Sequence, residues 1–355
     1  MRAAVPSRRV IVVGAGVTGL LTAVECARSG HRVTLLERGP VPNPESSSSD
    51  HHRVIRTLSA DDADATGRMI AAHRRWLALE TLLGVSFYRR VGVVTAVPRE
   101  RLARVCAAGA AARVPVRTVD PERLPHLRWP TGSAAVLEAD GGVLLADRVL
   151  RAAARWLAAH PAVTVRPYSP VAGVDVDSAH VLLSGGEKLG ADLVLVAAGP
   201  WTRDLVGHPV VLHRQTMVYL RPPADAARWW GTAPAAGGLG ADGRAWVMPP
   251  GGGALLKISS DTVSREVSST ADGAAQDHAP WVARLFEAAP LSGLERYAVA
   301  AVKECHYATA ADTGGAVLAR VGPAVWSRPA CGGSGFSQAP LVAGRIVDAL
   351  MKGAA

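Results

Sequence analysis

The N-terminal segment holds the feature that most constrains the fold of this chain. Val10–Val13 is a short β-branched run, typical of a buried parallel strand, and Gly14–Gly19 follows with the pattern G-x-G-x-x-G. Leu20–Ser29 has the pattern of a helix, and a second apolar run, His31–Leu36, ends at Glu37. A strand, a glycine turn, a helix, a second strand and a terminal acid, in this order, are the fingerprint of a dinucleotide-binding βαβ unit.

Each part of this fingerprint has a physical task. Gly14 allows a tight turn, Gly16 lets the backbone approach a pyrophosphate, and Gly19 lets the helix pack closely on the strand. The N-terminus of the helix offers free N–H groups and a partial positive charge to phosphates. Glu37 can accept hydrogen bonds from a ribose, which a glycine-rich turn in an unrelated α/β protein would not explain. We therefore expect a dinucleotide to be held by Gly14, Ala15, Gly16, Val17, Thr18, Gly19, Glu37 and Arg38.

Further elements of a nucleotide-binding sheet recur along the chain. Ala191–Val196 is an apolar run that leads to small residues at Gly199, and it predicts a second central strand. Val210–Arg221 alternates like a strand of a different sheet. Residues 113–128 are expected to be irregular, and residues 222–253 to form loops across a pocket.

This order of elements predicts a mixed α/β (α+β) fold, in which a Rossmann-type domain contains an inserted antiparallel-sheet substrate domain. Nucleotide-binding elements occur at the start, middle and end of the chain, with antiparallel elements between them. The boundaries that we expect are 1–85, 135–205 and 300–355 for the discontinuous cofactor domain, and 86–134 and 206–299 for the substrate domain.

Composition excludes several classes of protein. With 49% hydrophobic and 19% charged residues, the chain of 355 residues can bury a sizeable core and is not disordered. No apolar run approaches the ~20 residues that span a bilayer, so we expect no membrane partner. The net charge of +9 comes from scattered arginines, and aromatic residues make up only 5%, so we expect no nucleic-acid partner.

The cysteines and the N-terminus add two expectations. The four cysteines form no C-x-x-C pair, which argues against a disulfide scaffold and a structural zinc, so we expect no metal. Met1–Arg9 carries arginines before an apolar run that is too short for a secretory segment. We therefore expect a cytoplasmic protein.

Several segments together resemble one family. Ser47–Arg56 is a serine-rich loop that ends in R-V-I-R, and Leu256–Ile258 places a lysine on an apolar strand. Glu304–Asp312 contains C-x-Y-x-x-x-x-D, and Gly332–Phe336 is a second glycine-rich turn. Along nearly its whole length the chain resembles the FAD-dependent amine oxidoreductases of the monomeric sarcosine oxidase and N-methyltryptophan oxidase group, within the D-amino-acid oxidase superfamily. Shorter matches are Arg128–Pro130, Asp140–Leu144, Ala198–Trp201 and His213–Gln215.

The resemblance implies that the cofactor is FAD and that the Rossmann-type domain is the FAD-binding domain. It also implies a covalent bond between Cys305 and the flavin 8α carbon, which requires a thiolate whose pKa Lys303 could lower. The alternative for Cys305 is a buried structural cysteine, such as we expect for Cys26. The remaining residues that the resemblance places around the flavin are Ser48, Ser49, Arg53, Val171, Gly199, Trp201, Gly333, Gly335 and Phe336.

The resemblance also implies roles at the reacting end of the site. Lys257 would stabilise negative charge that develops on O2, unless it is a lysine on the exposed face of an edge strand. Arg53 would lie at the flavin and Arg56 would bind a substrate carboxylate, unless both belong to a basic surface loop. Tyr307 would face the substrate pocket, and with Asp261 it is a candidate for proton handling. His306 is a third such candidate.

Two positions depart from the family pattern. Ser337 stands where the family often has a lysine that grips the substrate carboxylate, and Asp261 stands where it has a histidine. A carboxylate at Asp261 suits a cationic or hydrogen-bonding group of the substrate. We therefore do not expect sarcosine itself to be the substrate.

The sequence thus predicts an FAD-dependent oxidase that acts on the C–N bond of a secondary or cyclic amine, or an amino acid, and yields an imine and hydrogen peroxide. Its partners would be this small-molecule amine and O2, and we expect a monomer. Three alternatives stay open. They are a flavin amine dehydrogenase that passes electrons to a partner, an NAD(P)-dependent reductase without flavin, and an inactive protein that retains flavin.

Overall fold

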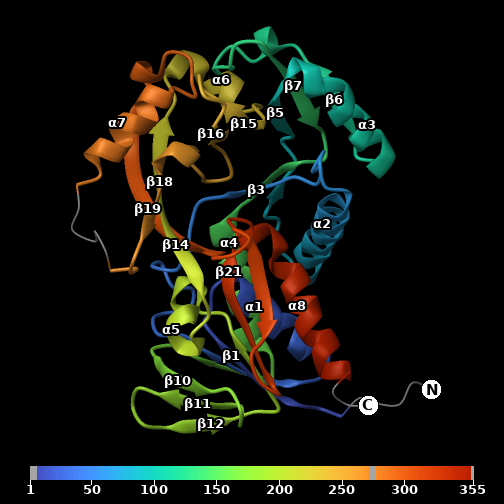
Figure 1. Ribbon diagram of the computed structural model, residues 1–355, viewed down its shortest axis with the longest axis vertical. Helices are drawn as coiled ribbons and strands as arrows, with labels where there is room; N and C mark the ends of the chain where they lie inside the picture. Colours follow the sequence, from blue (N-terminus) through green and yellow to red (C-terminus); the bar gives the residue numbers. More distant parts are fainter. Residues whose placement is uncertain (1–5, 272–276, 353–355) are drawn as a thin grey trace.

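The computed structural model describes residues 6–271 and 277–352 (Figure 1). In this view a parallel sheet and its covering helices occupy the lower half, and strands of a second, larger sheet occupy the upper half. The long strands β14 (Val210–Arg221) and β19 (Ala298–Ala310) pair along their length and run between the two halves. Of the predicted domain ranges, residues 1–5, 272–276 and 353–355 lie outside the described residues.

The parallel sheet is built around the N-terminal strand, as the sequence predicts. Val10 of β1 is in register with Leu193 of β13 on one side and with Val33 of β2 on the other, and both pairings are parallel. The predicted second central strand is therefore confirmed. Among the described strands of this sheet, the edge strand β20 alone runs antiparallel to its neighbour. In spatial order the described strands are β20 (Ala316–Arg320), β21 (Val325–Cys331), β13 (Leu193–Val196), β1 (Arg9–Val13), β2 (Arg32–Leu36) and β9 (Val163–Arg166).

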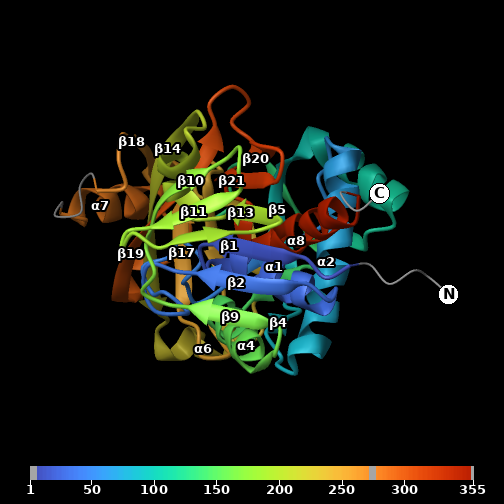
Figure 2. The same ribbon diagram turned by 90° about the horizontal axis from the view of Figure 1, so that it is seen from below.

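Alternating residues of β1 separate the two cores of this half. Val10 and Val12 pack with helices on one face, and Ile11 and Val13 pack against a small three-stranded sheet on the other. Figure 2 shows the helices gathered beside the parallel sheet. These helices are α1 (Val17–Arg28), α4 (Ala146–Ala159) and α8 (Gly335–Lys352), and α2 (Ala63–Leu83) packs against α8. The small sheet consists of β10 (Val171–Asp175), β11 (His180–Leu183) and β12 (Lys188–Gly190).

The larger sheet contains nine strands among the described residues. It is antiparallel except where β15 (Ala235–Leu239) runs parallel to β5 (Val93–Pro98). Its other strands, besides β14 and β19, are β6 (Val116–Val119), β7 (Ser133–Glu138), β16 (Ala245–Met248), β17 (Leu256–Ser260) and β18 (Ser264–Val267). A further sheet of β3 (Arg53–Ile55), β8 (Gly142–Leu144) and β4 (Tyr88–Arg89) contributes to the cavity wall. The remaining helices described are α3 (Leu102–Ala112), α5 (Thr202–Val206), α6 (Ala227–Trp230) and α7 (Ala279–Ala288).

Two expectations about irregular segments are wrong. Residues 113–128 contain strand β6, and residues 222–253 contain β15, α6 and β16. Each of these strands has a partner outside its segment, since β6 pairs with β7, β15 with β5 and β16 with β17, and β15 and β16 also pair with each other. Short strands that are stabilised by such distant pairing carry little periodicity of their own.

The mixed α/β fold is confirmed, whereas the division into domains stays a prediction. Strands β7 and β19 lie near the expected boundaries at 135 and 300, and both pair within the larger sheet. If sheet membership defines the domains, the boundaries move to the ends of these strands, near Glu138 and Ala310.

Candidate functional site

A cavity of about 1310 Å³ lies between the carboxyl ends of the parallel strands and the inner face of the larger sheet. Its wall includes Val13 and Leu36 from the ends of β1 and β2, and Gln215 and Tyr307 from β14 and β19. The carboxyl edge of an open parallel sheet is where such folds bind ligands. The cavity brings together most of the predicted site residues: Gly14, Gly16, Val17, Thr18, Glu37, Arg38, Ser48, Arg53, Arg56, Val171, Gly199, Trp201, Asp261, Cys305, Tyr307, Gly333, Gly335 and Phe336.

The glycine turn has the crowded geometry that its sequence predicts. Gly14 has φ +98°, and a Cβ there would lie 2.6 Å from the carbonyl oxygen of Ala197. A Cβ on Gly19 would lie 1.8 Å from the carbonyl oxygen of Gly14. Gly19 and Ala15 are not among the residues that line the cavity, so they shape the turn from behind. Only glycine fits at the first and last of the three positions.

Glu37 organises the turn from the end of β2. Its Oε2 accepts a hydrogen bond from the Ala15 N–H at 2.8 Å, and its Oε1 accepts from Asn43 Nδ2 at 3.0 Å and from the Gly39 N–H at 3.1 Å. The carboxylate is buried at the cavity wall. It therefore shapes the turn in addition to facing the position expected for a ribose.

The N-terminus of α1 is suited to an anion. Its N-cap residue, Gly16, has no side chain to cap it, and its first turn holds no acidic residue. The Val17 N–H donates to Ser48 Oγ at 3.0 Å, which ties the serine-rich loop to this turn. Gly199 and Gly333 line the cavity where a Cβ would meet no described atom within 4 Å. The residues present therefore fit a bound dinucleotide.

Asp50 is the centre of a buried charged cluster beside the cavity. Its carboxylate accepts hydrogen bonds from Lys257 Nζ at 2.9 Å and from the Tyr219 hydroxyl at 2.6 Å, and it forms an ion pair with Arg53 Nη1 at 2.6 Å. The side chains of Asp50 and Lys257 are wholly buried. Burial alone would raise the pKa of Asp50, but Arg53 and Lys257 outweigh it and hold this pKa well below its usual range.

Lys257 lies behind the cavity wall. Besides Asp50, its Nζ donates to the carbonyl oxygen of His52 at 2.6 Å, and it lies 5.7 Å from the ring of Trp246, which does line the cavity. The alternative of an exposed lysine on an edge strand is wrong, because β17 is paired with both β14 and β16. Burial lowers the pKa of Lys257 to about 8, although Asp50 opposes this.

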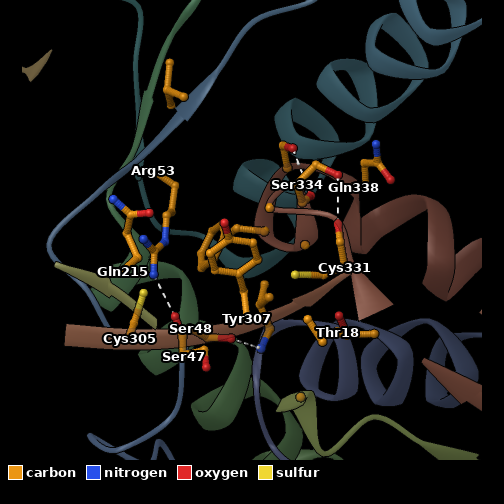
Figure 3. A pocket seen from close by; sticks show the side chains of 18 of the residues that line it. Thr18, Ser47, Ser48, Arg53, Gln215, Cys305, Tyr307, Cys331, Ser334 and Gln338 are labelled. Atoms are coloured by element: carbon orange, nitrogen blue, oxygen red, sulfur yellow. Dashed lines mark hydrogen bonds between the residues drawn. The ribbon is translucent and has the colours of Figure 1, made fainter. Parts of the chain in front are cut away.

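Cys305 and Tyr307 project from β19 into the cavity. Cys305 is in register with Gln215, and Tyr307 with His213, whose ring stacks on the tyrosine at 4.8 Å between centroids. Figure 3 shows Tyr307 between Arg53 and Cys305 on one side and Cys331 and Ser334 on the other. The Tyr307 hydroxyl shares a hydrogen bond of 2.9 Å with Ser264.

Burial raises the pKa of the Cys305 thiol. Arg53, Lys257 and Lys303 all act to lower it, as the sequence suggests for Lys303, but desolvation outweighs them. Lys303 is partly committed elsewhere, because its Nζ donates to the carbonyl oxygen of Ser49. Ser49 itself, although predicted at the flavin, is not among the residues that line the cavity.

The remaining predicted residues differ in exposure. Arg56 and Asp261 are exposed and line the cavity, and Arg38 lies 3.9 Å above the ring of Trp201. Phe336 is buried and stacks on Trp76 at 5.6 Å between ring centroids.

Four further residues at or beside the cavity were not singled out from the sequence. Asp50 carried a signal, since it is a lone acid between a serine run and His51, His52 and Arg53. Gln215 lies in the segment His213–Gln215, which resembles the family. That it is the cross-strand partner of Cys305 follows only from the strand pairing. Arg328 and Cys331 line the cavity from β21, and nothing local in the sequence marks them.

Among the described residues, no group of three or more His, Cys, Asp or Glu side chains is arranged to hold a metal ion. Within the same residues, no helix combines the length and the apolar character needed to cross a membrane.

Residues 9–349 match the family model described as FAD dependent oxidoreductase. The chain belongs to this family. The predicted family and the FAD cofactor class are thereby confirmed, and the alternative of a nicotinamide reductase without flavin is contradicted.

Similar proteins agree with this membership. The FAD-dependent oxidoreductase described here is 29% identical to peroxisomal sarcosine oxidase of Homo sapiens over 205 residues, 55% of this chain and 51% of that protein. It is 26% identical to monomeric sarcosine oxidase of Bacillus sp. (strain B-0618) over 206 residues, 56% of this chain and 52% of that protein. The matched part thus spans about half the length of these relatives.

A solved structure supports the fold over almost the whole chain. The open form of NikD, described as an unusual amino acid oxidase essential for nikkomycin biosynthesis, superposes with a TM-score of 0.79. The superposition covers 97% of this chain and 94% of that one, at 20% identity. At this identity the likeness concerns the fold alone.

Proposed function

We propose that this FAD-dependent oxidoreductase is an oxidase of the C–N bond of a secondary or cyclic amine, or an amino acid, which yields an imine and hydrogen peroxide. One observation carries the proposal. The dinucleotide turn at Gly14–Gly19 and the Cys305–Tyr307 segment of β19 open into the same cavity. A ligand that reaches from α1 to β19 would bring a redox ring to the residues that suit an amine.

The chain's own residues would hold FAD along this path. The N-terminus of α1 and the Ser48 loop would bind the diphosphate, and Glu37 the ribose. Gly333–Phe336 would lie along the flavin, and Cys305 would attach to it covalently. When bound, FAD supplies the acceptor for a hydride equivalent from the amine carbon.

Arg56 and Asp261 would orient the substrate. Both are exposed to the cavity, and their opposite charges suit the carboxylate and the amino group of an amino acid. Tyr307 would form the wall of the pocket between them, and its hydroxyl is held by a hydrogen bond with Ser264. Since Ser337 offers no second cation, Arg56 would bind the carboxylate without the help of a lysine at that position.

Lys257 would stabilise negative charge on O2 from behind the wall. A buried cation acts strongly through a medium of low dielectric constant. Asp50 would keep the lysine in place through the 2.9 Å ion pair. The same ion pair favours a second candidate function, a flavin amine dehydrogenase. A lysine whose charge is balanced by Asp50 attracts negative charge on O2 less strongly.

The test begins with the visible spectrum of the purified protein after acid precipitation. Yellow colour in the pellet supports the covalent flavin, and peptide mapping then distinguishes Cys305 from Cys331. Yellow colour in the supernatant contradicts the covalent bond but still supports a flavoenzyme. A protein that stays colourless with added FAD contradicts the proposal.

The second step uses a panel of secondary amines, cyclic amines and amino acids without oxygen. Bleaching of the flavin identifies substrates, and readmitted O2 with detection of hydrogen peroxide distinguishes an oxidase from a dehydrogenase. Fast reoxidation by an artificial acceptor but not by O2 supports the second candidate. Failure of every amine to bleach a yellow protein supports the inactive flavin-binding alternative. A monomer in the cytoplasm remains our expectation, which sedimentation and cell fractionation check.

A further inference from the structure

Arg328 is a buried cation that the proposed chemistry leaves unused. It lies on β21 directly after Ser327, which is in register with Val196 at the end of β13. Only 8% of the residue is exposed, and it lines the cavity. Its position is therefore on the side of the parallel sheet, at the edge where dinucleotides bind.

The guanidinium lacks compensation within the part of the chain that the structure describes. Its Nε and Nη2 are buried and have no hydrogen-bond partner there, and it forms no ion pair with a carboxylate of the described residues. Burial lowers the pKa of Arg328, and the Cys331 thiol is the one group that raises it. Because arginine stays protonated in proteins, the site holds an unpaired buried positive charge, which is costly without a partner.

The other arginines of the cavity are accounted for. Arg53 is paired with Asp50, and Arg38 lies over the ring of Trp201. Arg56, Arg101 and Arg244 are exposed, so water solvates their charge. Arg328 is thus a largely buried donor at the cavity wall, and a bound anion would compensate its charge.

The surroundings indicate which anion would bind. β21 packs against the short turn Gly199–Trp201, and Ala197 at the end of the neighbouring strand closes over Gly14 of the dinucleotide turn. Figure 3 shows Cys331, at the end of β21, on the same side of the cavity as Thr18 in the first turn of α1. We propose that Arg328 binds a diphosphate oxygen of the bound FAD, opposite the N-terminus of α1. This inference rests on the flavin site proposed above.

The experiment compares flavins with and without a diphosphate. Arg328→Met and Arg328→Lys are made together with the control Arg244→Met, which removes an exposed cavity arginine. All are placed in a Cys305→Ala background, so that the flavin can be removed and added back. Dissociation constants for FAD and for riboflavin are measured by fluorescence quenching. The melting temperature of each flavin-free protein is measured with and without inorganic pyrophosphate.

We expect Arg328→Met to weaken FAD binding about tenfold or more and to leave riboflavin binding unchanged. Pyrophosphate should raise the melting temperature of the Cys305→Ala parent and of Arg244→Met, but not of Arg328→Met. Arg328→Lys should retain part of the FAD affinity and part of the stabilisation by pyrophosphate. Equal weakening of FAD and riboflavin would mean a structural role and would overturn the inference. Unchanged FAD affinity with a raised KM for an acidic substrate would also overturn it, since the anion would be a carboxylate. If the parent binds neither flavin, the proposed function fails as well.

Discussion

The two faces of the β14–β19 strand pair carry similar charged clusters in different surroundings. On the cavity face, Tyr219 of β14 donates to Asp50, which lies between Arg53 and Lys257. On the opposite face, one carboxylate again lies between two cations, since Glu304 is paired with Arg214 and Arg265. The alternation of a β-strand produces this separation.

The two clusters differ in the groups that surround them. Asp50 and Lys257 are wholly buried beside the cavity, whereas the cluster around Glu304 extends to Arg265, which lies 4.2 Å over the ring of Trp281, and to the half-buried His278. Both carboxylates have lowered pKa values, because their cations outweigh desolvation. We infer that the first cluster affects chemistry in the cavity and that the second only stabilises the fold.

The largest effect is expected for Asp50→Asn. It leaves Lys257 and Arg53 without their carboxylate, and breaking a buried ion pair costs about 3–5 kcal/mol. Urea unfolding should show this loss of stability, and the double variant Asp50→Asn/Lys257→Met should recover part of it. A loss below about 1 kcal/mol would mean that water reaches the cluster, as it does at a surface ion pair.

Lys257→Met should slow the reaction with oxygen about 100-fold, the usual size for one electrostatic stabiliser. Asp50 keeps Arg53 as a partner, so the protein should fold. Stopped-flow mixing of the amine-reduced enzyme with O2 measures the rate, and anaerobic reduction by the amine should change far less. Lys188→Met, on the exposed end of β12, serves as the control. Equal slowing of both half-reactions would contradict a role limited to oxygen.

Glu304→Gln should lower stability by about 1.5–3 kcal/mol, because it removes the charged hydrogen bond from Arg265 and the ion pair with Arg214. The flavin spectrum and both half-reactions should stay as in the parent, since the cluster lies on the face away from the cavity. A changed oxygen rate in this variant would show that the two faces of the strand pair are coupled.

The smallest effect is a pH dependence of the oxygen reaction. Burial and Arg53 lower the pKa of Lys257 to about 8 from its usual value of 10.5, although Asp50 acts to raise it. The cation is therefore present below this pKa and is lost as the pH rises through it. The rate of the reaction with O2 should decline above about pH 8. At higher pH the decline should approach a factor of about ten for each pH unit. The profile of Lys257→Met should lack this decline, and its persistence there would assign the titration to another group.

Much of the fold follows from local sequence patterns. The strand–turn–helix–strand unit from Arg9 to Leu36 is confirmed with its pairing to β13, because apolar runs and glycine spacing are short-range properties. Strands β6, β15 and β16 were not predicted, since long-range pairing decides whether such segments become strands. The resemblance to a family supplied Cys305, Tyr307 and Arg56, and the structure adds that all three line one cavity.

The sequence by itself therefore determined the dinucleotide turn, the mixed α/β class and the family, because each depends on residue types at fixed local spacing. Only the tertiary structure decided which charges meet. Lys257 and Asp50 are separated by 207 residues along the chain, yet their charged atoms lie 2.9 Å apart. By the same packing, Nε and Nη2 of Arg328 are left without a hydrogen-bond partner among the described residues. Pairing and isolation of buried charges depend on how distant segments fold over one another, and no local pattern encodes that.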